Sequence, residues 1–161
     1  MIKQTIFAAA MAVAATAAFA QSDTTPQQFV DKAAASDMFE IESSKLALQR
    51  SQMPATRALA EHMITDHSAT SARLSSIVAG TSLTVPTRMD SAHEQMMARL
   101  ANASSGEFDA AYIMAQQSVH KAAVEMFTTY SASGTEPALK AYAEETLPAL
   151  RNHRNAVDAM K

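Results

Sequence analysis

Three of the five histidines in this 161-residue chain interrupt apolar helical stripes. His67, His120 and His153 recur with apolar neighbours at spacings of three and four residues, which keeps each series on one helix face. Each imidazole is therefore expected to point toward a packed interior, where an unpartnered polar ring costs about 1–3 kcal/mol. A hydrogen-bonding neighbour, a water or a metal must satisfy it. The three stripes are Leu59, Met63, His67, Thr70, Leu74 and Ile77; Asp109, Ile113, Gln116, His120, Ala123, Phe127 and Tyr130; and Leu139, Ala143, Thr146, Leu150, His153, Val157 and Met160.

Other chemistry-bearing residue types are less informative. His62 and His93 fall off the apolar stripes and are expected in solvent. Methionine thioethers can bind copper(I), but the methionines form no close Met-x-x-Met cluster and are expected to fill the core. The chain has no cysteine and only 3 glycines. Thiol catalysis and a glycine-rich phosphate loop are therefore excluded, whereas a Ser–His–Asp arrangement cannot be judged without geometry.

The elements that must position these side chains are helices. The sequence is rich in alanine, leucine, methionine and glutamine, and no long stretch alternates apolar and polar residues. Prolines, glycines and capping patterns predict four long helices with short connections and one extra short helix. We therefore predict an all-α, antiparallel four-helix bundle. The expected helices start at the Thr25–Pro26 cap and run to about Gln52; from Pro54 to before Gly80; from Asp90 through Leu100; from the Ser104/Glu107 capping box to before Gly134; and from a Thr135 cap to the C-terminus, with a kink at Pro148.

The first residues predict export. Lys3 precedes an alanine-rich apolar run that ends in a small-x-small pattern at Ala18 and Ala20. This is typical of a signal peptide over residues 1–20, cleaved before Gln21, because the run is too short to span a bilayer. Residues 21–161 would then form one periplasmic or otherwise exported domain without a transmembrane segment. Its formal charge is −4, from 13 − 1 basic and 16 acidic residues, and no long block of either sign suggests nucleic-acid binding.

Four segments together resemble the bacterial domain of unknown function 4142 family. They occur in the family's order and cover the chain from about Pro26 to Met160. The resemblance implies an exported, ferritin-like four-helix domain, and it implies no reaction. The segments are Phe39-Glu40-Ile41-Glu42 with Lys45-Leu46-Ala47-Leu48; Ala60-Glu61-His62-Met63-Ile64-Thr65-Asp66-His67; Phe108-Asp109-Ala110-Ala111-Tyr112 followed by His120; and Leu147-Pro148-Ala149-Leu150-Arg151-Asn152-His153.

The resemblance adds Glu40, Asp66 and Asp109 to the candidate site. Carboxylate and imidazole ligands suit iron, zinc, manganese or copper. A ferritin-like di-iron centre would also need Glu-x-x-His motifs, but none precedes the three stripe histidines. A conventional di-iron centre is therefore not expected. The candidate metal ligands are Glu40, Asp66, His67, Asp109, His120 and His153.

Two classes of function fit these observations. The first is a non-enzymatic envelope or stress-related module, in which the histidines and carboxylates form a buried polar network that fixes helix register. The second is a metal-binding or metal-dependent redox protein of the ferritin-like kind. Metal content separates the two classes, and the sequence identifies no substrate, protein partner or oligomeric state.

Overall fold

The computed structural model describes residues 24–160, and the predicted signal peptide lies outside them. Within the described residues the chain is entirely helical, as predicted. No helix among them combines the length and the apolar character needed to cross a membrane. The helices are α1 (Pro26–Arg50), α2 (Pro54–Val78), α3 (Ser91–Asn102), α4 (Phe108–Ser133) and α5 (Pro137–Asp158).

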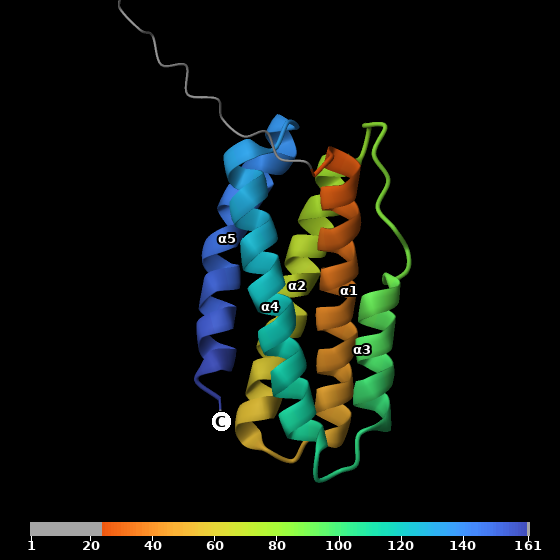
Figure 1. Ribbon diagram of the computed structural model, residues 1–161, viewed down its shortest axis with the longest axis vertical. Coiled ribbons are helices and arrows are strands. Elements are labelled where there is room, and N and C mark those ends of the chain that lie inside the picture. The colour runs from red at the N-terminus through yellow and green to blue at the C-terminus, as the bar shows by residue number, and fades with distance from the viewer. Residues whose placement is uncertain (1–23, 161) are drawn as a thin grey trace, which may run out of the picture.

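The four long helices form an antiparallel bundle, in which helices that pack against each other run in opposite directions (Figure 1). Helix α1 packs mainly against α2, and α4 packs mainly against α5. The two pairs meet through contacts of α1 with α4 and of α2 with α5. The short helix α3 lies outside the bundle against α1 and α4 (Figure 1). This arrangement confirms the predicted four-helix bundle with one extra helix.

Two of the predicted helix starts are confirmed by their caps. Thr25 and Gln28 form the expected capping box at the start of α1, with the Thr25 side chain accepting from the Gln28 amide at 3.2 Å. Asp90 caps α3 by accepting from the His93 amide at 2.9 Å. In both cases a side-chain oxygen satisfies a backbone donor that has no partner inside the helix.

The other two predicted caps are wrong. Ser104 donates to the carboxylate of Glu107 at 2.6 Å instead of capping a backbone amide, and α4 begins after Glu107. Helix α5 begins after Glu136, not Thr135, with Pro137 in its first turn. Proline is suited to that position because its fixed φ matches the helix and its missing N–H would have no helical partner there. Pro148 lies inside α5, which continues through it to Asp158.

The core divides into two apolar clusters. One contains Phe29, Leu74, Phe127 and Leu139 among its members, and the other contains Phe39, Met63, Phe108 and Val157 among its members. Along each long helix, buried polar side chains lie between residues of the two clusters. The polar members are Ser36, Asp37, Glu40, Ser43 and Ser44 on α1, His67 on α2, Gln116 and His120 on α4, and His153 on α5. The bundle therefore has a polar layer inside an otherwise apolar core.

Candidate metal centre

Three helices bring His67, His120 and His153 together in this polar layer. Their ring centroids are 5.6 Å apart for His67 and His120, 5.4 Å for His67 and His153, and 5.3 Å for His120 and His153. Each residue is at most 3% exposed. One nitrogen of each ring lies within 4.8 Å of a nitrogen of the other two. The predicted convergence of the stripe histidines inside one core is therefore observed.

Each of the three rings has one nitrogen held by an acceptor on the periphery of the cluster. The Nδ1 of His67 lies 2.8 Å from Oδ1 of Asp37, and the Nε2 of His153 lies 2.8 Å from Oδ2 of Asp66. The Nδ1 of His120 lies 3.0 Å from the backbone carbonyl of Gln116. Ionised carboxylates and carbonyl oxygens only accept hydrogen bonds, so each of these ring nitrogens carries the proton.

The other nitrogen of each ring makes none of these outer hydrogen bonds. These nitrogens are Nε2 of His67, Nε2 of His120 and Nδ1 of His153. Nε2 of His67 is buried without a hydrogen-bond partner. Nε2 of His120 lies 3.4 Å from Nδ1 of His153, although neither nitrogen has a proton to donate when both outer hydrogen bonds are made. Three imidazoles that each offer a nitrogen within 4.8 Å of the other two are a ligand set that suits a transition-metal cation.

Glu40 lies beside the His120 ring and is 0% exposed. Its Oε1 is 3.6 Å from Nδ1 of His120, and neither carboxyl oxygen has a hydrogen-bond partner. Burial raises the pKa of Glu40 to about 7, although the nearby His67 and Gln116 side chains act in the opposite direction. Glu40 is thus a carboxyl group that a positive charge in the cluster would keep ionised.

The rings differ in their electrostatic surroundings. Burial and, to a smaller extent, the neighbouring His67 lower the pKa of His120 to about 3. Burial also lowers the pKa of His153, against the opposing hydrogen bond to Asp66. For His67, burial acts downward, but the hydrogen bond to Asp37 and the charge of Glu40 outweigh it and leave the pKa raised. Carboxylates thus favour positive charge at His67, whereas burial disfavours it at the other two rings.

The predicted ligand set needs one correction. Asp109 does not join the cluster, because its carboxylate accepts a hydrogen bond from Ser51, the C-cap residue that follows α1. Asp109 lies three turns before His120 on the same stripe, and that separation along the helix axis places it at the α1–α2 turn. Glu40 and Asp66 do lie at the cluster, with Asp66 34% exposed and bonded to His153.

The structure also adds a residue that the sequence analysis missed. Asp37 is 6% exposed and holds His67. Thr70 also donates to its Oδ1, at 3.1 Å. The spacing from Ala33 through Asp37 to Glu40 follows the buried face of α1, so helical periodicity alone could have identified it.

A second group lies at the surface edge of the cluster. His62, Asp66 and His153 each offer a ligand atom within 4.8 Å of the other two. His62 is exposed, as predicted, and its ring centroid lies 5.2 Å from that of His153. Its Nε2 is 3.4 Å from the same Asp66 oxygen that accepts from His153. His153 therefore belongs to both groups.

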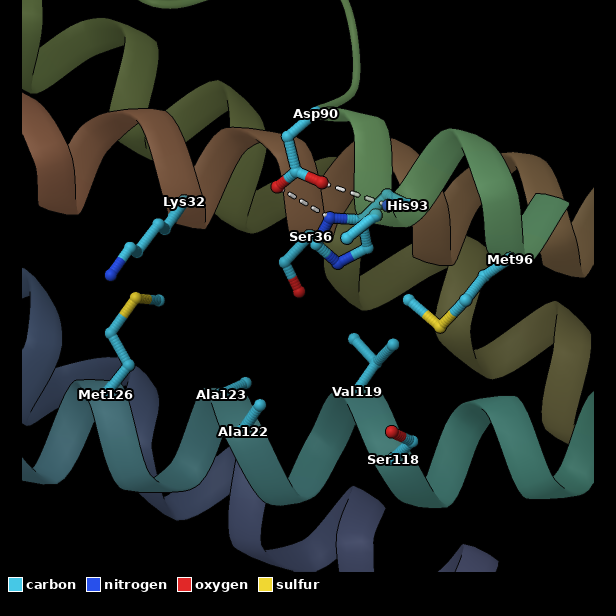
Figure 2. Close-up of a pocket in the computed structure, with 11 residues that line it drawn as sticks. Lys32, Ser36, Asp90, His93, Met96, Ser118, Val119, Ala122, Ala123 and Met126 are labelled. Atoms are coloured by element: carbon cyan, nitrogen blue, oxygen red, sulfur yellow. Dashed lines mark hydrogen bonds and ion pairs between the residues drawn. The ribbon is translucent and has the colours of Figure 1, made fainter.

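The prediction that His93 is solvent-exposed is wrong. Its side chain is 15% exposed, and its Nδ1 lies 2.9 Å from Oδ2 of Asp90. Figure 2 shows the His93 ring beside Ser36 in a pocket between α4 and the α1–α3 pair, with Lys32 at one end. This pocket of about 370 Å³ is otherwise lined mainly by apolar side chains. Its charged or titratable lining is one histidine, the Asp90 carboxylate bonded to it and a lysine, and none of these belongs to the two groups of candidate metal ligands.

Comparison with known proteins identifies the family. The model of the domain of unknown function DUF4142 matches residues 8–160. The chain belongs to this family. A search of curated proteins with this chain found no match. Among solved structures, "CopM in the Cu(II)-bound form" is similar, with a TM-score of 0.68 and 20% sequence identity. The likeness covers 83% of this chain and 93% of that one, and at this identity it shows a shared fold alone.

Proposed function

We propose that this member of the DUF4142 family is an exported metal-binding protein, and that His67, His120 and His153 bind one transition-metal ion inside the bundle. The proposal rests on the different roles of the two nitrogens in each of the three rings. Each ring has one nitrogen within hydrogen-bond distance of an outer acceptor, and one nitrogen of each ring lies within 4.8 Å of a nitrogen of the other two. Histidine ligands of metals commonly have this pattern, in which an outer acceptor fixes the ring orientation and raises ligand basicity.

The charge around the cluster supports a cation. Carboxylates of Asp37, Glu40 and Asp66 surround the three rings, and among the described residues no lysine or arginine side chain is buried. Protonation of His67 would supply positive charge, but its Nε2 has no acceptor for the added proton. An ion bound there satisfies the charge balance and the free lone pair together. Bonds of ~2 Å would draw the three nitrogens to about 3.3 Å of one another.

Copper(II) is the ion that we propose the site prefers. Imidazole nitrogens suit zinc, copper, iron and nickel, whereas manganese prefers oxygen ligands. Among divalent ions of the first transition row, copper(II) binds a given nitrogen site most tightly. The similarly folded protein named above was solved in a Cu(II)-bound form, which agrees with this choice. Glu40 is the residue placed to balance the charge of the bound ion.

The function that we propose is to hold the ion, not to catalyse a reaction. The three ligating residues are each at most 3% exposed, so a bound ion would have little room for a substrate. Export through residues 1–20 would place the protein in the cell envelope, where a ferritin-like bundle could buffer or carry copper. The polar layer would also fix the register of the four helices, as the non-enzymatic interpretation of the sequence requires.

The test is a metal titration of the mature chain, purified without a histidine tag. We expect one copper(II) ion per chain, and tighter binding than for zinc or manganese. The His120→Gln variant should lose the tight site because it removes a ligand. Circular dichroism would show whether the variant keeps its helical content. A matched His93→Gln variant should bind copper like the unmodified chain, because His93 lies outside the cluster.

Two results would overturn the proposal. One is the absence of stoichiometric binding of any transition metal by a folded chain. The other is copper bound equally well by the His120→Gln variant, which would place the ion elsewhere. In the first case the three histidines would form the buried polar network alone.

A further inference from the structure

We infer that His62, Asp66 and His153 form a surface entry site through which the ion reaches the buried three-histidine site, and that the two sites share His153 and are never filled together. The inference rests on the proposed metal-binding function and adds a route and a stoichiometry to it. An ion needs a route to the three histidines because they are buried. Ligands that are at most 3% exposed cannot capture an ion from water directly.

The cluster opens to the surface at one edge. Behind His67 lies Asp37, which is 6% exposed, and beside His120 lie Glu40 and Gln116, which are both 0% exposed. At His153 the neighbours are instead Asp66, whose side chain is 34% exposed, and His62, whose side chain is 60% exposed. An ion that approaches the cluster through its ligands must therefore pass His62 and Asp66.

These two residues and His153 are themselves a set of metal ligands. The carboxylate oxygen of Asp66 lies 3.4 Å from Nε2 of His62 and 2.8 Å from Nε2 of His153. The two imidazole nitrogens and the carboxylate oxygen are mutually within 4.8 Å. Two imidazoles and one carboxylate suit copper(II) and zinc. Because two of the three side chains are in contact with solvent, the ligand exchange needed for capture can occur there.

His153 links the two sites because its two nitrogens face different ligands. Nε2 faces Asp66, and Nδ1 faces Nε2 of His120 at 3.4 Å. A neutral imidazole has only one unprotonated nitrogen. It can therefore ligate an ion at the entry site through Nε2 or at the buried site through Nδ1, but not at both at once.

Both tautomers of His153 have a hydrogen-bond acceptor in place. With the ion at the entry site, Nδ1–H can donate to His120. With the ion at the buried site, Nε2–H donates to Asp66. Transfer would break the bonds from the ion to His62, Asp66 and Nε2 of His153, and would form bonds to His67, His120 and Nδ1 of His153. Nδ1 gives up one proton to water and Nε2 takes one from water at the exposed edge, so the transfer is neutral in protons.

The experiment follows copper(II) binding to the metal-free mature chain in a stopped-flow instrument. Tyrosine fluorescence is the signal, since the chain has 3 tyrosines and no tryptophan. The unmodified chain should show a fast phase whose rate rises with copper concentration. A slower phase, independent of copper concentration, should follow as the ion moves inward. The final stoichiometry should stay at one ion per chain when copper is in excess.

His62→Gln is the decisive variant. His62 is a ligand only at the entry site, so its loss should slow loading and release by the same factor, on the order of tenfold, and leave the dissociation constant unchanged. His93→Gln is the matched control, since His93 is also a histidine paired with an aspartate, at 2.9 Å. It should load at the unmodified rate. His120→Gln should keep the fast phase and lose the slow one.

The outcomes separate the two proposals. If the unmodified chain binds no ion, the proposed function fails and the entry route fails with it. If it binds one ion and the His62→Gln variant loads and releases at unmodified rates, the entry route alone is wrong. Two ions held at once by the unmodified chain would contradict the shared use of His153.

Discussion

Asp37 is not a candidate ligand, but it sets the orientation and the protonated nitrogen of His67, which is one. Its Oδ1 holds Nδ1 of His67 at 2.8 Å and thereby keeps the proton on that nitrogen and the lone pair on Nε2. An asparagine at this position would accept a weaker hydrogen bond and would remove a negative charge next to the ion. The ring would then be held less firmly and would be less basic.

We therefore predict that Asp37→Asn lowers copper affinity by roughly 10–100-fold while the bundle stays folded. Asp31→Asn is the matched control, because Asp31 is an exposed carboxylate on the same helix. Competition titrations against a chelator of known affinity measure the change. Equal affinities for the two variants would mean that Asp37 does not position a metal ligand.

Glu40 gives the metal-free protein a specific pH dependence. Its pKa is raised from 4.5 to about 7 in the folded chain, so the folded state holds its proton more tightly than the unfolded state does. The stabilisation of the folded state that comes from the protonated Glu40 is complete below about pH 4.5. It is lost as the pH rises through about 7, where the folded chain must ionise a buried carboxyl. The loss amounts to about 3 kcal/mol, from the difference between the two pKa values.

Glu40→Gln should remove this dependence, because an amide does not titrate. Urea unfolding of both metal-free proteins between pH 4.5 and 7.5 measures the effect. The stability of the unmodified chain, relative to the variant, should fall by about 3 kcal/mol across this range. Parallel pH profiles for the two proteins would contradict the assigned role of Glu40.

At the residue scale, the sequence predicted the meeting of the three histidines better than it predicted which acidic residues lie beside them. His67, His120 and His153 are each set within an apolar stripe, and helical periodicity placed all three in one core. Asp109 shares such a stripe, but position along the helix axis decides which residues of a stripe meet. Periodicity defines the face of a helix and not the height at which neighbouring helices align. Neither the stripe nor the family resemblance, which added Asp109 to the candidate site, therefore indicates that Asp109 bonds to Ser51 instead.

At the scale of the element, one arginine and the buried Leu100 attach the C-terminal end of α3 to the bundle. Arg50, the last residue of α1, donates from Nη1 to the carbonyl of Leu100 at 2.9 Å and to that of Ala101 at 3.0 Å. It also donates from Nη2 to the carbonyl of Ala103, and its guanidinium lies 4.6 Å from the centroid of the Phe108 ring. These carbonyls lie at the C-terminal end of α3, where a helix leaves carbonyls without helical partners, and that of Leu100 also accepts from the Ala103 amide at 3.3 Å.

We predict that Arg50→Ala destabilises the chain by about 2–4 kcal/mol, because several charge-assisted hydrogen bonds are lost together. Hydrogen exchange in α3 should rise more than exchange in the four long helices. The control is Arg99→Ala, an exposed arginine in the last turn of α3, which should cost less than about 0.5 kcal/mol. Similar losses for the two variants would show that Arg50 does not anchor α3.

Helix ends were predictable where a side chain caps the backbone directly. Thr25 and Asp90 do so, and both starts were placed correctly. Ser104 and Glu107 have the spacing of a capping box but bond to each other through their side chains. The same residue types can make either interaction, and the packing of α3 and α4 around that loop decides between them. Spacing alone contains no information on that packing.

At the scale of the whole molecule, the bundle aligns four polar side-chain sets that are far apart in the sequence. Residues 36–44, 67, 116–120 and 153 meet between two apolar clusters. The apolar surroundings strengthen every electrostatic interaction within the layer, including the attraction between the carboxylates and a bound cation. The fold therefore places the candidate metal site where its ligands are held most firmly.

Export is the prediction that concerns the whole chain. The apolar run of residues 6–20 and its small-x-small end predict a mature protein that begins at Gln21. N-terminal sequencing of the protein recovered from the cell envelope measures this directly. Replacing Ala18 and Ala20 by lysine should block cleavage. A protein recovered with Met1 still in place would contradict the predicted cleavage.

The central claim, that three histidines from three helices bind one ion, is tested most directly by X-ray absorption at the copper edge of the loaded mature chain. The account predicts three imidazole nitrogens at about 2 Å from copper, and two in the His120→Gln variant under the same loading. Thioether sulfur in the copper shell, or an imidazole count that is the same in both proteins, would contradict it.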